Sequence, residues 1–111
     1  MIAVSLIAAA LAAQSAEPAE PGAMVLAQAQ DRCMATYAVR LTKTSATDEG
    51  IYAEAVSGCK DLNGQLIAAI AREYSPAQAA ELTAAMEAQA KPNFLKLLQR
   101  IRADRLQRAG N

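Results

Sequence analysis

The two cysteines of the chain constrain its fold more than any other feature. Cys33 and Cys59 lie thirteen residues on either side of Ala46, within a short polar stretch, 44–47. If helices flank this stretch, a rise of 1.5 Å per residue places each cysteine about 15 Å from the turn. Facing side chains can then bring the two Cα atoms to the separation of about 5.5–6 Å that a disulfide needs. The spacing therefore predicts a helical hairpin pinned by a Cys33–Cys59 disulfide.

A structural role is the favoured interpretation of this disulfide. Closing a loop of this length stabilises a fold by about 3–4 kcal/mol in the chain-entropy model. Redox-active thiols are usually exposed and often occur as Cys-x-x-Cys, which this chain lacks. A zinc site needs more ligands than two cysteines in a chain without histidine. Two free buried thiols, a redox pair and a metal site remain the alternatives, and we expect no cofactor.

The start of the chain indicates export. Residues 1–16 carry no charge, and their apolar run from Ile2 to Ala13 is too short to span a bilayer. This pattern predicts a signal peptide over 1–16, although no Lys or Arg precedes the apolar run; a short uncleaved anchor and a misassigned start are the alternatives. Residues 17–22, Glu-Pro-Ala-Glu-Pro-Gly, are typical of a solvated linker. We therefore expect a periplasmic or secreted protein, in a compartment where paired cysteines persist.

Apolar periodicity predicts an all-α domain over 23–108, followed by a tail, 109–111. Thr47 is a predicted N-cap, and Ser75 with Gln78 has the pattern of a capping box. Pro92 either separates the last two helices or bends a single one. The expected fold is a small three- or four-helix bundle built on the hairpin, with helices over 23–43, 48–74, 76–89 and 93–107.

The second predicted helix has the clearest apolar stripe. Its members recur three or four residues apart or lie beside such positions: Tyr52, Ala55, Val56, Cys59, Leu62, Leu66, Ile67, Ile70 and Tyr74. Gly58 and Gly64 each weaken a helix interior by about 1 kcal/mol relative to alanine. We therefore expect both glycines beside a close helix contact or a bend.

No pattern in the sequence matches a known active site. Histidine is absent, which removes the commonest general base and the commonest metal ligand. We therefore expect that the protein is not an enzyme. The competing hypothesis is a carboxylate or lysine enzyme, which would need a concave pocket with perturbed pKa values. Its candidate residues are Asp48, Glu49, Glu54, Lys60 and Asp61.

The C-terminal stretch, 91–111, contains six cations and one acid, although the whole chain has a formal net charge of zero. On a helix, Phe94, Leu97, Leu98 and Ile101 share one face, and Arg105 and Arg108 continue it. Such a helix can dock on the hairpin, with its cations toward an acidic body, or it can contact a partner or a membrane. The candidate contact residues are Lys91, Phe94, Lys96, Arg100, Arg102, Arg105 and Arg108.

These features together indicate a small, non-catalytic binding or structural protein of the cell envelope. Its expected partner is an envelope protein, and an anionic membrane surface is the alternative. Nucleic acid is not expected, because the periplasm offers little of it. The sequence leaves the oligomeric state open.

Overall fold

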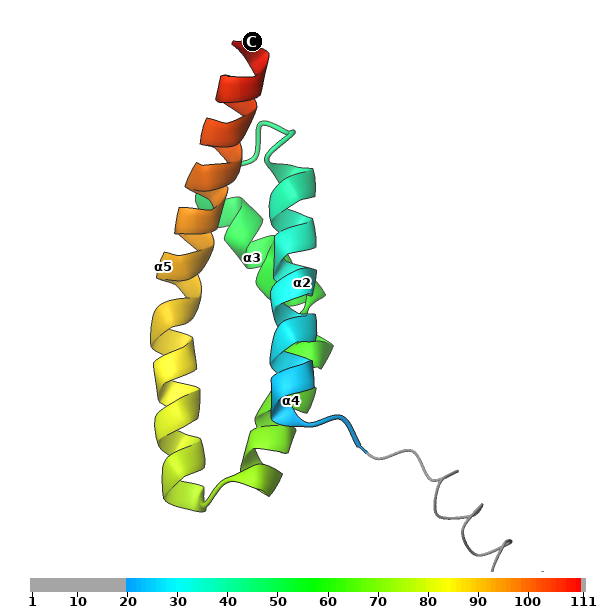
Figure 1. Cartoon of the computed structure of the whole chain (residues 1–111), viewed down its shortest axis with the longest axis vertical. Coiled ribbons are helices and arrows are strands. Elements are labelled where there is room, and N and C mark those ends of the chain that lie inside the picture. The colour runs from blue at the N-terminus through cyan, green and yellow to red at the C-terminus, as the bar shows by residue number, and fades with distance from the viewer. Residues whose placement is uncertain (1–19, 111) are drawn as a thin grey trace, which may run out of the picture.

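The computed structural model describes residues 20–110, and all of their regular secondary structure is α-helical. The helices in this range are α2 (Ala23–Leu41), α3 (Asp48–Gly58), α4 (Lys60–Glu73) and α5 (Pro76–Ala109). The chain rises along α2, returns through α3 and α4, and rises again along α5, which follows the whole length of the hairpin (Figure 1). The expected all-α fold is confirmed. The predicted signal peptide, 1–16, lies outside the described residues.

The predicted disulfide is present. Cys33, in the middle of α2, is bonded to Cys59, and their Cα atoms are 6.0 Å apart. Cys59 lies between α3 and α4 and is 1% exposed. The bond joins the two arms of the hairpin at mid-length, as the symmetric spacing of the cysteines predicted.

The single helix predicted over 48–74 is wrong, because the chain bends at Cys59. This residue has φ −103° and ψ 13°, outside the α-helical region, and it ends α3 and begins α4. The hydrogen bonds Cys59 N–H to Ala55 C=O and Asn63 N–H to Cys59 C=O continue on both sides, at 2.9 and 3.1 Å. The expected bend at Gly58 is confirmed. The corresponding expectation for Gly64 is wrong, since a Cβ there would meet nothing within 4 Å.

α5 is one continuous helix, and Pro92 lies inside it. An interior proline removes one backbone hydrogen bond. A helix that packs against its neighbours before and after the proline bends there more readily than it ends. The predicted capping box begins the helix: the Ser75 hydroxyl accepts from Gln78 N–H and the Gln78 side chain accepts from Ser75 N–H, each at 3.3 Å. Separate helices over 76–89 and 93–107 are therefore not formed.

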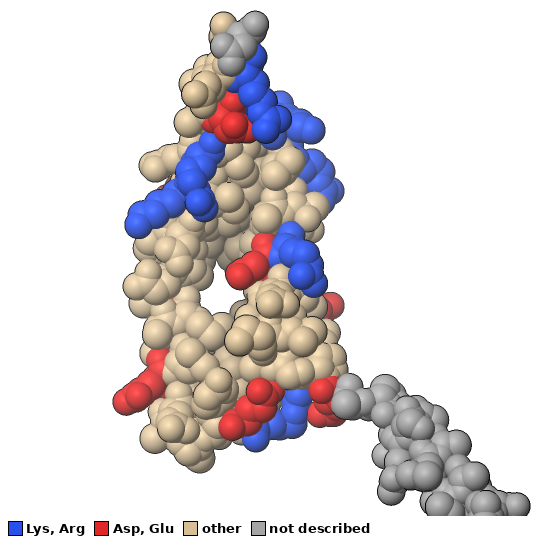
Figure 2. All heavy atoms as spheres, viewed as in Figure 1, with Lys and Arg blue, Asp and Glu red and all other residues tan. Residues whose placement is uncertain are grey.

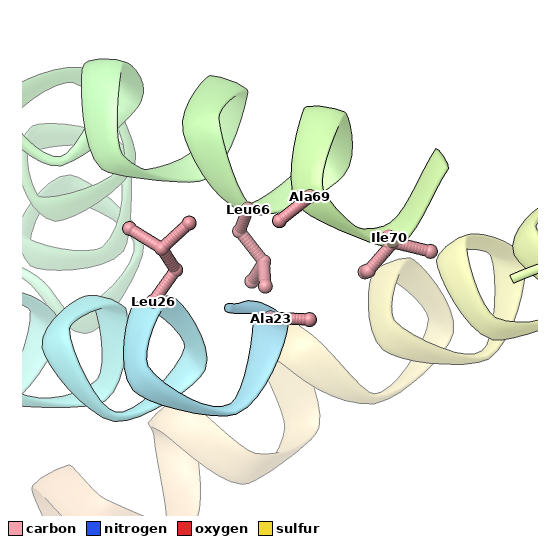
Figure 3. Packing of buried hydrophobic residues seen from close by; sticks show 5 residues of the cluster. All are labelled: Ala23, Leu26, Leu66, Ala69 and Ile70. Carbon is pink, nitrogen blue, oxygen red and sulfur yellow. The ribbon is translucent and has the colours of Figure 1, made fainter. Parts of the chain in front are cut away.

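The molecule is thin, and Figure 2 shows an opening between α5 and the rest of it. Buried residues form one cluster on each side of this opening. The lower cluster joins the start of α2 to α4. Figure 3 shows its side chains in the space between these two helices: Ala23, Leu26, Leu66, Ala69 and Ile70. The upper cluster joins α2, α3 and α5: Ala38, Ile51, Ala55, Phe94 and Leu98. Two small cores thus replace one central core.

The buried stripe of α3 and α4 is narrower than the sequence predicted. Ile51, which the predicted stripe omitted, is fully buried at 0% exposure. Val56, Ile67 and Tyr74, which it included, are 45%, 38% and 44% exposed. Each helix is covered along one side only, so apolar residues at the edge of the stripe remain in contact with water.

The linker end of the domain is fixed by side chains of α4. α2 has no side-chain N-cap of its own, and the Glu73 carboxylate accepts from Ala23 N–H at 2.6 Å instead. Beside it, Arg72 forms an ion pair of 3.1 Å with Glu20. A negative charge at this position also complements the positive end of the helix dipole.

Candidate binding surface

Cations gather at one end of the molecule, formed by the C-terminal halves of α2 and α5 (Figure 2). Residues 32–43 carry Arg32, Arg40 and Lys43 and no acid. Residues 91–108 carry the six cations identified from the sequence, with Asp104 as their one acid. We refer to residues 32–43 and 91–108 together as the basic end. Which of its cations can reach a ligand depends on where each side chain is directed.

Two of the α5 cations are directed at the start of α3. Arg102 forms an ion pair of 2.6 Å with Asp48, and Lys91 forms one of 2.6 Å with Glu49. Both acids belong to the first turn of α3, which Thr47 caps by accepting from Gly50 N–H at 3.1 Å. These acids therefore stabilise the helix N-terminus and hold α5 against it.

Arg105 is directed at the other side of the hairpin turn, where α2 ends. Its guanidinium donates to the Thr42 hydroxyl at 2.6 Å and to the Val39 carbonyl at 2.7 Å. The carbonyl is among the last four of α2, which have no partner within the helix, and a cation is favourable there. Arg105 interrupts the apolar face of α5, and its side chain donates hydrogen bonds to groups at the C-terminal end of α2.

The remaining candidate residues of α5 divide between core and solvent. Phe94 is 5% exposed and contacts Tyr52, with ring centroids 5.4 Å apart, so it belongs to the core and not to a contact surface. Arg108 pairs with Asp104 on its own helix at 3.1 Å. Lys96 and Arg100 are exposed and form no ion pair within residues 20–110. On the helix they lie on nearly the opposite side from the buried Leu98.

Sequence reasoning overlooked a second set of exposed cations, on α2. A shallow depression in the surface of this helix is lined by Arg32, Ala35, Thr36, Val39, Arg40 and Lys43. Arg40 lies over the Tyr37 ring, 5.1 Å from its centroid. Arg32 and Lys43 form no ion pair in the described part of the chain. Their spacing along the predicted first helix was the available signal.

The five residues of the enzyme hypothesis are not brought together. Asp48 and Glu49 form ion pairs with α5 cations, at the start of α3. Lys60 and Asp61 begin α4, one length of α3 away, which is about 16 Å at the helical rise. Two shallow surface depressions of the described residues are lined by other side chains, on α2 and around Tyr74 and Leu82. Nor do three or more metal-ligating side chains gather anywhere between residues 20 and 110.

Comparisons with protein-family models, with curated proteins and with solved structures found no match to this chain. Within residues 20–110, none of the helices combines the length and the apolar character needed to cross a membrane. The basic end is therefore the candidate site, on the strength of its own geometry and charge.

Proposed function

We propose that the protein is a non-catalytic binding protein of the cell envelope, exported to the periplasm or secreted. Its exposed cations bind an anionic macromolecular surface. The observation that carries the proposal is the group of cations without carboxylate partners among the described residues, which lie on α2, on the turn after it and on α5, from mid-length toward one end of the molecule: Arg32, Arg40, Lys43, Lys96 and Arg100.

The disulfide supports the proposed compartment. Disulfides persist in secreted and periplasmic proteins and are rare where cellular thiols are kept reduced. The uncharged apolar start of the chain supports the same route. The mass of the exported protein tests it directly, because cleavage removes the leader residues and the intact disulfide lowers the mass by two hydrogens.

The distribution of charge supports a binding role. Cations gathered at one end repel each other and lower the stability of the folded state. For Lys91, Arg102 and Arg105, ion pairs and hydrogen bonds with the hairpin offset this loss of stability. The exposed cations of α2 and the outer side of α5 have no such contact within the described residues, and an anionic ligand would supply it.

Binding to two anionic probes tests this function. The exported, disulfide-bonded protein is titrated with phosphatidylglycerol-containing vesicles and with poly-glutamate, and phosphatidylcholine vesicles serve as the neutral control. We expect binding to at least one anionic probe, weakened at least about tenfold between roughly 0.05 and 0.5 M salt, because exposed charges are screened. Absence of binding to both anionic probes at low salt would contradict the proposal.

A further inference from the structure

We infer that the outer side of α2 is a membrane-contact surface for anionic phospholipid. The inference names the partner of the proposed anionic-surface binding and rests on that function. The surface, which we call the outer α2 stripe, consists of residues three or four apart along the helix and its C-terminal end: Val25, Gln28, Arg32, Ala35, Val39 and Lys43.

Most of the outer α2 stripe is accessible. It lies on the opposite side of α2 from Ala23 and Leu26, which are 8% and 5% exposed. Val25 and Val39 are 55% and 46% exposed, large fractions for branched apolar side chains. Gln28 and the two cations are exposed as well. The stripe thus presents apolar, uncharged polar and cationic groups together on one side of the helix.

Positive charge dominates the stripe and its C-terminal surroundings. The stripe contains no acid, and Asp31 lies about 100° around the helix from Arg32. Arg40 lies beside the C-terminal end of the stripe. Arg105 adds a further guanidinium there, since it donates to the carbonyl of Val39. An anionic membrane attracts each such cation near its surface, so several in one line act together.

The side chains of the stripe fit lipid headgroups better than a protein partner. Cores of protein interfaces are enriched in aromatic residues, methionine and arginine and depleted in lysine and alanine. The stripe has alanine and valine between its two cations and no aromatic residue. Long cationic side chains can reach phosphate groups while Val25 and Val39 contact the boundary of the acyl chains. The depression between Arg32 and Lys43 is shallow, which is compatible with contact with a planar surface.

A second copy of the chain is a poorer occupant. Two outer α2 stripes facing each other would bring Arg32 and Lys43 of both copies together, and like charges across an interface are unfavourable.

The outer side of α5 is also a poorer membrane surface. Its two cations, at positions 96 and 100, are flanked by Asn93, Ala103 and Gln107, and its exposed large apolar side chain, Leu106, lies at the edge of this side, about 60° around the helix from Ala103.

This difference provides a matched experiment with two variants of equal charge. Arg32→Gln/Lys43→Gln removes two cations from the stripe, and Lys96→Gln/Arg100→Gln removes two from α5. Each cation close to an anionic membrane contributes about a fivefold change in binding, so the α2 variant should bind phosphatidylglycerol-containing vesicles about 25-fold more weakly. The α5 variant should lose less than about threefold, because in this inference its cations do not face the lipid and salt screens their attraction to it. Thermal unfolding of both variants confirms that they are folded.

A tryptophan reporter gives a second readout, because the chain contains no tryptophan. Val39→Trp places the indole on the stripe, and Val56→Trp places it at a similarly exposed position of α3. Vesicle binding should shift the emission of the Val39→Trp protein to shorter wavelength and leave that of the Val56→Trp protein unchanged.

Three outcomes would overturn the inference: equal losses in the two charge variants, an unchanged emission at position 39, or binding to poly-glutamate without binding to vesicles. The last of these would leave the proposed anionic-surface function intact. Binding to neither probe would overturn the function and the inference together.

Discussion

Gly58 allows the two arms of the hairpin to approach at the point where the disulfide joins them. A Cβ built on this residue would lie 2.7 Å from Cε2 of Tyr37, and closer still to the Cζ and hydroxyl of the same ring. The ring comes from α2, and Cys59 is the next residue along the chain from the glycine. The absent side chain therefore makes room for Tyr37 beside the Cys33–Cys59 bond.

Gly58→Ala should destabilise the protein, whereas Gly64→Ala should stabilise it. The first substitution forces the Tyr37 ring to move, and such overpacking typically costs about 1–3 kcal/mol. The second meets no atom within 4 Å and gains helix propensity, up to about 1 kcal/mol. Urea denaturation of both variants measures the difference. If the two substitutions changed the free energy of unfolding in the same direction, the contact with Tyr37 would not be the cause.

The two glycines also show where sequence reasoning at this scale ends. Both lie inside one apolar pattern, and both were expected beside a close contact or a bend. Only Gly58 meets that expectation, because the Tyr37 ring that fills its space belongs to another helix. Chain position alone cannot tell a glycine that faces a neighbouring helix from one that faces water.

At the scale of the helix, α5 has an apolar face that could be predicted from the sequence. It also makes contacts through charged side chains that could not be predicted. Leu98 is fully buried and Leu97 and Ile101 lie beside it, as the 3.6-residue period indicates. The groups that receive Arg102 and Arg105 are 54 to 66 residues away along the chain. Helical periodicity placed Arg105 on the docking face, but it could not identify the hydroxyl and carbonyl that Arg105 binds or the carboxylate that Arg102 binds.

Replacing Arg105 by alanine should loosen the C-terminal turns of α5 and lower the stability by about 1 kcal/mol, because two charge-assisted hydrogen bonds at a partly exposed site are lost. Arg100→Ala, which removes an exposed cation from the same helix, should change it by less than about 0.5 kcal/mol. Urea denaturation gives both values, and amide hydrogen exchange over 102–109 reports the loosening. Equal effects of the two substitutions would mean that Arg105 does not hold α5 on the end of α2.

On the scale of the whole molecule, the fold depends on links between two small cores. The cysteine spacing predicted the hairpin because it depends on helical rise alone. The division into two clusters follows from the bend at Cys59 and from α5 touching the hairpin on both sides of an opening (Figure 2). Such long-range placement has no local signal in the sequence. Since neither cluster is large, the disulfide and the continuous helices α2 and α5 are the elements that hold the two halves in one unit.

Removing the disulfide should therefore cost a large share of the total stability. The bond joins residues 26 apart, and the chain-entropy model gives about 3.5 kcal/mol for a loop of that length. A domain of this size has roughly 5–14 kcal/mol in all. Cys33→Ala/Cys59→Ala is the direct test, because it removes the bond without depending on how readily a reductant reaches the buried Cys59 or the partly buried Cys33. Urea denaturation should show a midpoint far below that of the oxidised wild-type protein, and reduced wild-type protein should behave like the variant. A variant as stable as the oxidised protein would show that helix packing alone unites the two clusters.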